Sequence, residues 1–281
     1  MEIIKADDIG FCTGVKRAID IIEKAGHELG SMQTLGPVVH NQQVVDKLAA
    51  SGVVAIDSLD QASGHTIAVS SHGVSPQLLQ EARSRGLRII DTTCPFVRRA
   101  QLAAQKLAGE GYSVIVFGET SHPEVQGVLG YAGNNGLATV EIPEFAGIPK
   151  QVGLLSQTTQ SFPGFLKFVS TFIDRYLETI PEIRVINTIC NATRRHQQSA
   201  IELSKQVDLM LVVGSHHSAN TRRLAEICST LVPTYHIETA DEIDASWWQS
   251  LSSQRIGITA GASTPDDTIA EVISCLKKVA I

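Results

Sequence analysis

Three cysteines of the 281-residue chain share one sequence context. Each ends a short β-type segment and precedes a segment with helical spacing; the strand-like segments are EIIKADDIGFC ending at Cys12, LRIIDTTC at Cys94 and IRVINTIC at Cys190. A lone cysteine after an apolar strand is usually a small buried side chain, and that interpretation suits Cys228 and Cys275, which lie in helical apolar patterns. Three thiolates in one context instead indicate a soft metal site.

The number of thiolates restricts the kind of metal. A zinc site normally has four protein ligands, or three with an open position for water. A [4Fe–4S] cluster with three cysteine ligands leaves one iron open to a substrate oxygen, whereas electron-transfer clusters usually have four ligands. Three cysteines therefore favour a catalytic cluster. Two alternatives stay open at this point: a zinc hydrolase acting on a phosphorylated substrate, and a non-catalytic cluster protein such as a redox sensor.

Polar turns recur at fixed distances from these cysteines. His40, His122 and Ser218 each lie 28 residues after one of them (12 to 40, 94 to 122, 190 to 218), in turns that follow a strand-like segment and open a helix. A further strand–turn–helix pattern recurs with looser spacing and contains His72, Thr158 and Ser263. Because helix N-termini attract anions, these turns predict a phosphate site. Its candidate ligands are His40, His72, His122, Ser218, Asn220 and Ser263.

An acid lies beside one of these turns. Glu124 follows His122 by two residues, at an expected helix start. A carboxylate there is ordinarily explained by the helix dipole. The functional interpretation is a proton donor that faces the metal, with the hydroxyl of Thr158 relaying or orienting the proton.

These residues require elements to position them. Strands and helices alternate three times, which predicts an α/β fold with small parallel sheets. Parallel sheets bind ligands at the carboxyl ends of their strands, where all the motifs fall. We expect three similar lobes in a pseudo-three-fold arrangement around the cluster. The predicted boundaries are residues 13–93, 94–189 and 190–281, with the N-terminal strand 1–12 joining the third lobe.

Composition excludes several other classes of protein. The net charge is −6, the pI is near 5.8 and no Lys/Arg cluster stands out, which argues against a nucleic-acid partner. Five widely spaced cysteines do not form a disulfide framework. The N-terminal residues lack a signal or transit pattern, and the apolar runs are too short to span a membrane. We therefore expect a cytoplasmic protein, with no membrane partner.

The motifs resemble those of the 4-hydroxy-3-methylbut-2-enyl diphosphate reductase (IspH/LytB) family. The similarity covers almost the whole chain, in the family's order. The matching stretches are GFCTGVKRAI, GPVVHNQQVVDKL, SSHGVS, DTTCPFV, SHPEVQG, SQTTQS, TICNAT, VGSHHSANTRRL and TAGASTPD. The chain departs from the usual family pattern at Gln101 (often His), Asn191 (more often aromatic), Ala219 (often Ser) and the basic run Arg194-Arg195-His196.

The resemblance implies an iron–sulfur oxidoreductase that performs the last step of the methylerythritol phosphate route to isoprenoids. Cys12, Cys94 and Cys190 would hold one [4Fe–4S] cluster per subunit, with an open apical iron for the allylic hydroxyl group. A ferredoxin- or flavodoxin-type donor would supply two electrons, Glu124 a proton, and Thr158 would position the hydroxyl group. The six turn residues would bind the diphosphate, and isopentenyl and dimethylallyl diphosphate would be the products. The protein would be a monomer or homodimer.

Overall fold

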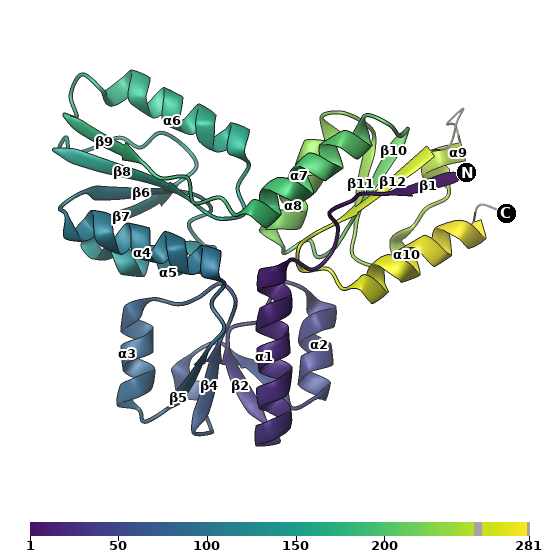
Figure 1. Cartoon of the computed structure of the whole chain (residues 1–281), viewed down its shortest axis with the longest axis horizontal. Coiled ribbons are helices and arrows are strands. Elements are labelled where there is room, and N and C mark those ends of the chain that lie inside the picture. The colour runs from purple at the N-terminus through teal and green to yellow at the C-terminus, as the bar shows by residue number, and fades with distance from the viewer. Residues whose placement is uncertain (250–254, 280–281) are drawn as a thin grey trace. The chain divides into compact units, whose positions relative to one another are not determined.

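The computed structural model describes residues 1–249 and 255–279 (Figure 1). It contains three four-stranded sheets in which every strand pair is parallel, with helices between the strands. The predicted α/β class and the three small parallel sheets are therefore confirmed. By their internal contacts the described residues form two compact units. The first unit comprises Met1–Lys16, His40–Val44 and Asn191–Ile281, and the second Arg17–Val39 and Val45–Cys190.

The first unit is built on one sheet. Its strand order is β1 (Glu2–Lys5), β12 (Arg255–Ala260), β10 (Leu209–Val213) and β11 (Thr234–Ile237). The N-terminal strand thus pairs with the last strand of the chain, with Glu2 opposite Arg255 and Lys5 opposite Ile258. β10 and β12 are apolar and almost wholly buried, as expected of central parallel strands. The helices are α7 (Asn191–Ser204), α8 (Ala219–Ser229), α9 (Ser246–Gln249) and α10 (Asp266–Val279), with a 3₁₀ turn at Ala240–Glu242.

The second unit contains two sheets. The first has the order β3 (Val53–Ile56), β2 (Met32–Leu35), β4 (Thr66–Val69), β5 (Arg88–Asp91), and the second β7 (Gly136–Thr139), β6 (Ser113–Phe117), β8 (Gln151–Ser156), β9 (Glu182–Val185). The helices α3 (Pro76–Ser84), α4 (Pro95–Gly109), α5 (Pro123–Ala132) and α6 (Phe162–Tyr176) belong to it. α1 (Thr13–Leu29) and α2 (Gln42–Ala50) have residues in both units. The 3₁₀ turns are Leu59–Gln61 and Gly133–Asn135.

Within the second unit, the loop after β4 packs closely against α5. A Cβ atom at Gly130 would lie 2.3 Å from the Cβ of Ser75, so a larger residue could not fit there. Gly73 has a φ of +68°, a conformation that side chains other than glycine rarely adopt. These two glycines allow the loop after β4 to approach α5 closely. No described helix is both long and apolar enough to cross a membrane.

Candidate functional site

The three cysteines have the same backbone environment. Each N–H donates to a carbonyl in the turn after the adjacent strand: Cys12 to Ala262 (3.1 Å), Cys94 to Ser71 (3.0 Å) and Cys190 to Thr158 (3.1 Å). The acceptors are the neighbours of Ser263 and His72, and Thr158 itself. Each cysteine therefore lies beside one of the predicted polar turns, because the strand before the cysteine pairs with the strand before that turn.

Their position also suits metal ligation. Each cysteine directly precedes a helix (α1, α4 or α7) and is half-buried, and no disulfide occurs in the described chain, which includes all five cysteines. A helix N-terminus favours the thiolate, the form that binds metals; the Cys12 sulfur accepts the N–H of Val15 at 3.4 Å. The donor set therefore fits a thiolate-bound cluster. Cys12 lies in the first unit, and Cys94 and Cys190 lie in the second.

The other two cysteines differ. Cys228 is fully buried among apolar residues that include Leu224 and Met210, and burial raises the pKa of its thiol. The interpretation of Cys228 as a core residue is thus confirmed. Cys275 is only partly buried on α10.

The first unit brings together three of the predicted phosphate ligands. Ser218 caps α8, its hydroxyl accepting the N–H of Thr221, and lies 3.5 Å from the hydroxyl of Ser263. Both serines follow the carboxyl ends of paired strands, β10 and β12. Asn220 lies in the first turn of α8, is 5% exposed, and neither of its amide atoms has a hydrogen-bond partner in the described chain. An unsatisfied buried amide is costly, which makes Asn220 a candidate to bind a ligand.

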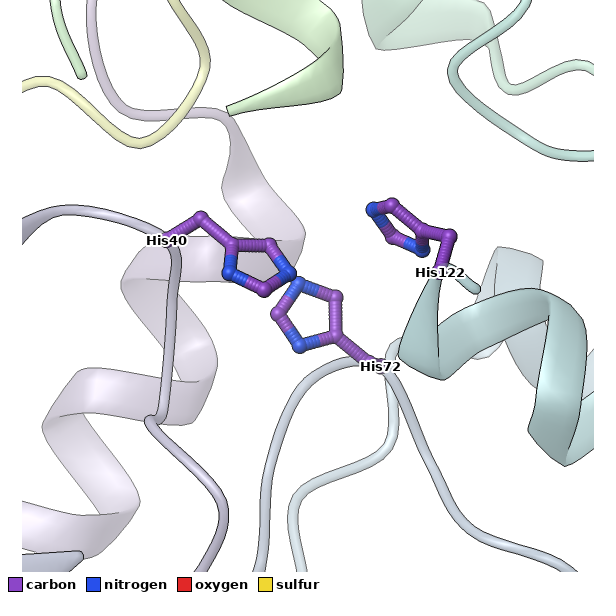
Figure 2. A group of neighbouring side chains, drawn as sticks. All are labelled: His40, His72 and His122. Carbon is purple, nitrogen blue, oxygen red and sulfur yellow. The ribbon is translucent and has the colours of Figure 1, made fainter. Parts of the chain in front are cut away.

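The second unit brings together two of the predicted histidines. The rings of His72, after β4, and His122, at the start of α5, lie edge to face with centroids 5.5 Å apart (Figure 2). His122 caps α5 by accepting the N–H of Glu124 at Nδ1 (3.2 Å), so in the neutral ring Nε2 carries the proton and can donate. Figure 2 also labels His40, which belongs to the first unit and precedes α2, where the Asn41 side chain caps Val44.

Glu124 and Thr158 form the most distinctive pair of the second unit. The Glu124 carboxyl accepts the backbone N–H of Thr158 at 2.6 Å and its hydroxyl at 2.7 Å. Glu124 is 2% exposed, and burial raises the pKa of its carboxyl because the charged form loses its hydration. The two hydrogen bonds from Thr158 oppose that shift only in part. A carboxyl group in this environment holds its proton to a higher pH than usual.

A pocket of about 560 Å³ lies beside His72, between α3 and α5. Its lining includes Ser70, Ser75 and Gln126 but neither Glu124 nor Thr158. The pocket therefore does not contain the candidate proton donor.

Gln101, the first departure from the family pattern, has a structural role. Its side chain is completely buried; it accepts a hydrogen bond from Arg98 at 2.8 Å and donates one to the carbonyl of Val74 at 3.5 Å. It links α4 to the loop after β4. Of the other departures, Ala219 is buried at the start of α8, and Asn191 is exposed.

Three arginines were not predicted as site residues. Arg17, Arg99 and Arg195 each contact the segment that leads into one of the three cysteines. The signal that could have found them is a basic pair, KR, RR or RR, that begins four residues after each cysteine.

Known proteins match the chain over nearly its whole length. A family model described as "LytB protein" matches residues 3–277. A 4-hydroxy-3-methylbut-2-enyl diphosphate reductase of Dehalococcoides mccartyi (strain CBDB1) is 49% identical, with 99% of both chains covered. The protein of that name from Geobacter sulfurreducens is 45% identical, covering 99% of this chain and 98% of the relative.

Two solved structures of such reductases are also similar to the chain over nearly its whole length. A structure of (E)-4-hydroxy-3-methyl-but-2-enyl diphosphate reductase, "the terminal enzyme of the non-mevalonate pathway", is 39% identical with a TM-score of 0.71, covering 99% of this chain and 100% of the other. The reductase from Plasmodium falciparum is 28% identical with a TM-score of 0.91, covering 98% and 88%. The chain therefore belongs to the LytB family of 4-hydroxy-3-methylbut-2-enyl diphosphate reductases, and it is an enzyme of the oxidoreductase class.

Proposed function

We propose that this chain reduces (E)-4-hydroxy-3-methylbut-2-enyl diphosphate to isopentenyl and dimethylallyl diphosphate, the terminal step of the non-mevalonate route. The names of the relatives support the substrate. The observation that carries the proposal is the buried Glu124 carboxyl, which Thr158 holds with both its N–H and its hydroxyl. Loss of an allylic hydroxyl group as water requires a proton, and burial raises the pKa of the Glu124 carboxyl so that it carries its proton to a higher pH than usual.

The proton reaches the substrate through Thr158. In the structure the Thr158 hydroxyl donates to the Glu124 carboxyl. When Glu124 is protonated, the hydroxyl accepts from it instead and donates to the leaving hydroxyl group, so it both relays the proton and orients the oxygen. Each turnover consumes two electrons and two protons. One proton leaves with the hydroxyl group as water, and the other adds to a carbon of the allyl unit, where the choice of carbon sets the product.

Cys12, Cys94 and Cys190 would hold one [4Fe–4S] cluster per chain. Three equivalent half-buried cysteines at helix N-termini support this ligand set. When bound, the cluster supplies the electrons and an iron that no protein thiolate occupies. We propose three lobes, residues 13–93, 94–189 and 190–281, with strand 1–12 joining the third.

The diphosphate is bound by His40, His72, His122, Ser218, Asn220 and Ser263. Two observations support Ser218, Asn220 and Ser263 as phosphate ligands. The Asn220 amide has no hydrogen-bond partner in the described chain, and the hydroxyls of Ser218 and Ser263 lie next to each other. His122 is supported as a ligand because its Nδ1 is used in the helix cap, which leaves the Nε2 proton to donate to a phosphate oxygen. The positive ends of α5 and α8 add to the attraction for phosphate oxygens.

The reaction needs an external reductant, for which we propose a ferredoxin- or flavodoxin-type protein of the cytoplasm. The enzyme is proposed to act as a monomer or homodimer, without nucleic-acid or membrane partners.

Metal and sulfide analysis of anaerobically purified protein separates this proposal from a zinc hydrolase. The proposal predicts about four iron and four sulfide per chain. It also predicts that the substrate changes the spectrum of the cluster. Protein that contains zinc but no sulfide would contradict it. A cluster whose spectrum and redox state do not change when the substrate is added would favour a redox sensor.

A further inference from the structure

The helix after each of the three cysteines carries two basic residues, four and five positions after the cysteine. The pairs are Lys16-Arg17, Arg98-Arg99 and Arg194-Arg195. They occur in a chain of net charge −6, close to helix N-termini, where the dipole disfavours positive charge. None of the three helices has an acidic residue in its first turn. Helix stability therefore does not explain the pairs.

The second member of each pair contacts the segment before the next cysteine in the chain. Arg17 Nη1 donates to the carbonyls of Thr92 (3.5 Å) and Thr93 (3.4 Å), the two residues before Cys94. Arg99 Nη2 donates to the carbonyl of Asn187 at 2.6 Å, three residues before Cys190. Both contacts lie inside the second unit.

The third contact completes a cycle inside the first unit. Arg195 Nε lies 3.4 Å from the Asp8 carboxylate, four residues before Cys12. α7 reinforces this contact: the Ser199 hydroxyl accepts the Asp8 N–H at 3.2 Å, and His196 Nε2 lies 3.0 Å from the Gly10 carbonyl. The helix after each cysteine thus holds the segment that leads into another cysteine. The helix after Cys12 holds the segment before Cys94, the helix after Cys94 the segment before Cys190, and the helix after Cys190 the segment before Cys12.

The charges of these arginines are compensated differently. Arg17 and Arg99 are exposed, and their hydrogen-bond partners in the described chain are carbonyls rather than carboxylates. Arg195 instead pairs with Asp8. Arg17 lies five residues after Cys12 and contacts the residues before Cys94. Arg99 lies five residues after Cys94 and contacts the segment before Cys190. Each therefore brings a positive charge, without a carboxylate partner among the described residues, to the cysteine-bearing segments.

We propose that Arg17, Arg99 and Arg195 are positioning residues that fix the cluster-bearing segments in this cyclic order, and that Arg17 and Arg99 also raise the reduction potential of the cluster. The second part rests on the cluster assignment in the proposed function. A positive charge near a cluster stabilises its reduced, more negative form, and groups outside the ligand set orient the ligands.

Hydrogen exchange of the apo protein tests the cyclic order without any cluster. Arg17→Gln should increase amide exchange by several-fold in residues 92–94, Arg99→Gln in 187–190 and Arg195→Gln in 8–12. Matched controls are Lys16→Gln and Lys106→Gln, which remove exposed charges from α1 and α4. Faster exchange around the variant's own preceding cysteine, a uniform increase, or no change would overturn the proposed order.

The cluster-loaded protein tests the second part. Arg99→Gln should lose iron to a chelator several-fold faster than the wild type and should have a lower reduction potential. Arg99→Lys keeps the charge but not the fork of donors, so it should restore the potential while iron loss stays faster. Wild-type loss rate and potential in Arg99→Gln would overturn this part while leaving the reductase assignment intact. If the wild-type protein binds no cluster, the reductase assignment and the effect on the potential are overturned. If the three variants still show the predicted changes in exchange, the cyclic order stands on its own.

Discussion

The carboxyl group of Glu124 is held by Thr158, through the backbone N–H at 2.6 Å and the side-chain hydroxyl at 2.7 Å. The same residue accepts the N–H of Cys190 at 3.1 Å. Thr158 thus connects the candidate proton donor directly to the segment of a candidate cluster ligand. In the proposed mechanism, this arrangement would place the proton supply beside the ligand segment of Cys190.

Replacing Glu124 by Gln should keep the cluster and substrate binding but lower turnover by about 10²- to 10⁴-fold, the usual contribution of a general acid. Gln is nearly isosteric and can still accept the Thr158 N–H, so the fold should persist. Dye-coupled turnover of protein with verified iron content measures the effect. Glu141→Gln, on an exposed segment, is the matched control. Near-normal turnover in Glu124→Gln would remove Glu124 from the mechanism.

The pKa of Glu124 also predicts how stability depends on pH. Burial raises the folded-state pKa above its ordinary value of 4.5, so between the two values the folded state binds more protons than the unfolded state. The stability that Glu124 contributes is therefore complete below the ordinary pKa and is lost as the pH rises through the folded pKa. Relative to wild type, Glu124→Gln should become more stable as the pH rises above the ordinary carboxyl pKa. Denaturant unfolding of the apo proteins measures this, and a difference that is constant with pH would contradict the raised pKa.

Thr158→Val should lower turnover, because it removes the hydroxyl relay while keeping the backbone N–H bond to Glu124. Thr158→Ser restores a hydroxyl and should recover most of the activity. Val keeps the size of Thr without the hydroxyl, and Ser keeps the hydroxyl without the methyl group, so recovery in Ser but not in Val assigns the effect to the hydroxyl. Equal activity in Val and Ser variants would show that Thr158 acts only through its backbone.

Asn220→Ala should raise KM by about tenfold or more, the cost of a hydrogen bond to a charged group, with a smaller change in kcat. Because the buried amide has no partner in the described chain, its removal should leave the melting temperature of the substrate-free protein unchanged or higher. Ser229→Ala, exposed at the end of the same helix, is the control. A destabilised variant with unchanged KM would make Asn220 a structural residue.

Cys94→Ser should abolish stable cluster assembly, whereas Cys275→Ser, on α10, should assemble a normal cluster. The serine hydroxyl is a much poorer ligand for iron than a thiolate. Iron and sulfide contents after anaerobic reconstitution give the result. A full cluster in Cys94→Ser would exclude Cys94 as a ligand.

Much of the fold follows from the sequence because its signals are local and repeated. The spacing of 28 residues places His122 and Ser218 at the start of predicted helices, and in the structure both cap a helix, because both follow a central parallel strand. In the turn of His40 the capping residue lies one position later, because the Asn41 side chain accepts the N–H of Val44. A repeat in sequence fixes the turn but not which neighbouring side chain satisfies the helix N–H groups.

Long-range contacts are harder to predict. The Glu124–Thr158 pair spans 34 residues, and the contact of Arg195 with Asp8 depends on the pairing of the first strand with the last. The basic pairs are visible in the sequence, but their role depends on which segment each side chain reaches, and that is a property of the folded chain.

The most direct test is anaerobic turnover with a reduced viologen dye. When 4-hydroxy-3-methylbut-2-enyl diphosphate is added to protein with a verified [4Fe–4S] cluster, two equivalents of the one-electron dye should be oxidised per substrate consumed. Isopentenyl and dimethylallyl diphosphate should appear together as products. Cluster-loaded protein that oxidises no dye and forms neither product would contradict the account.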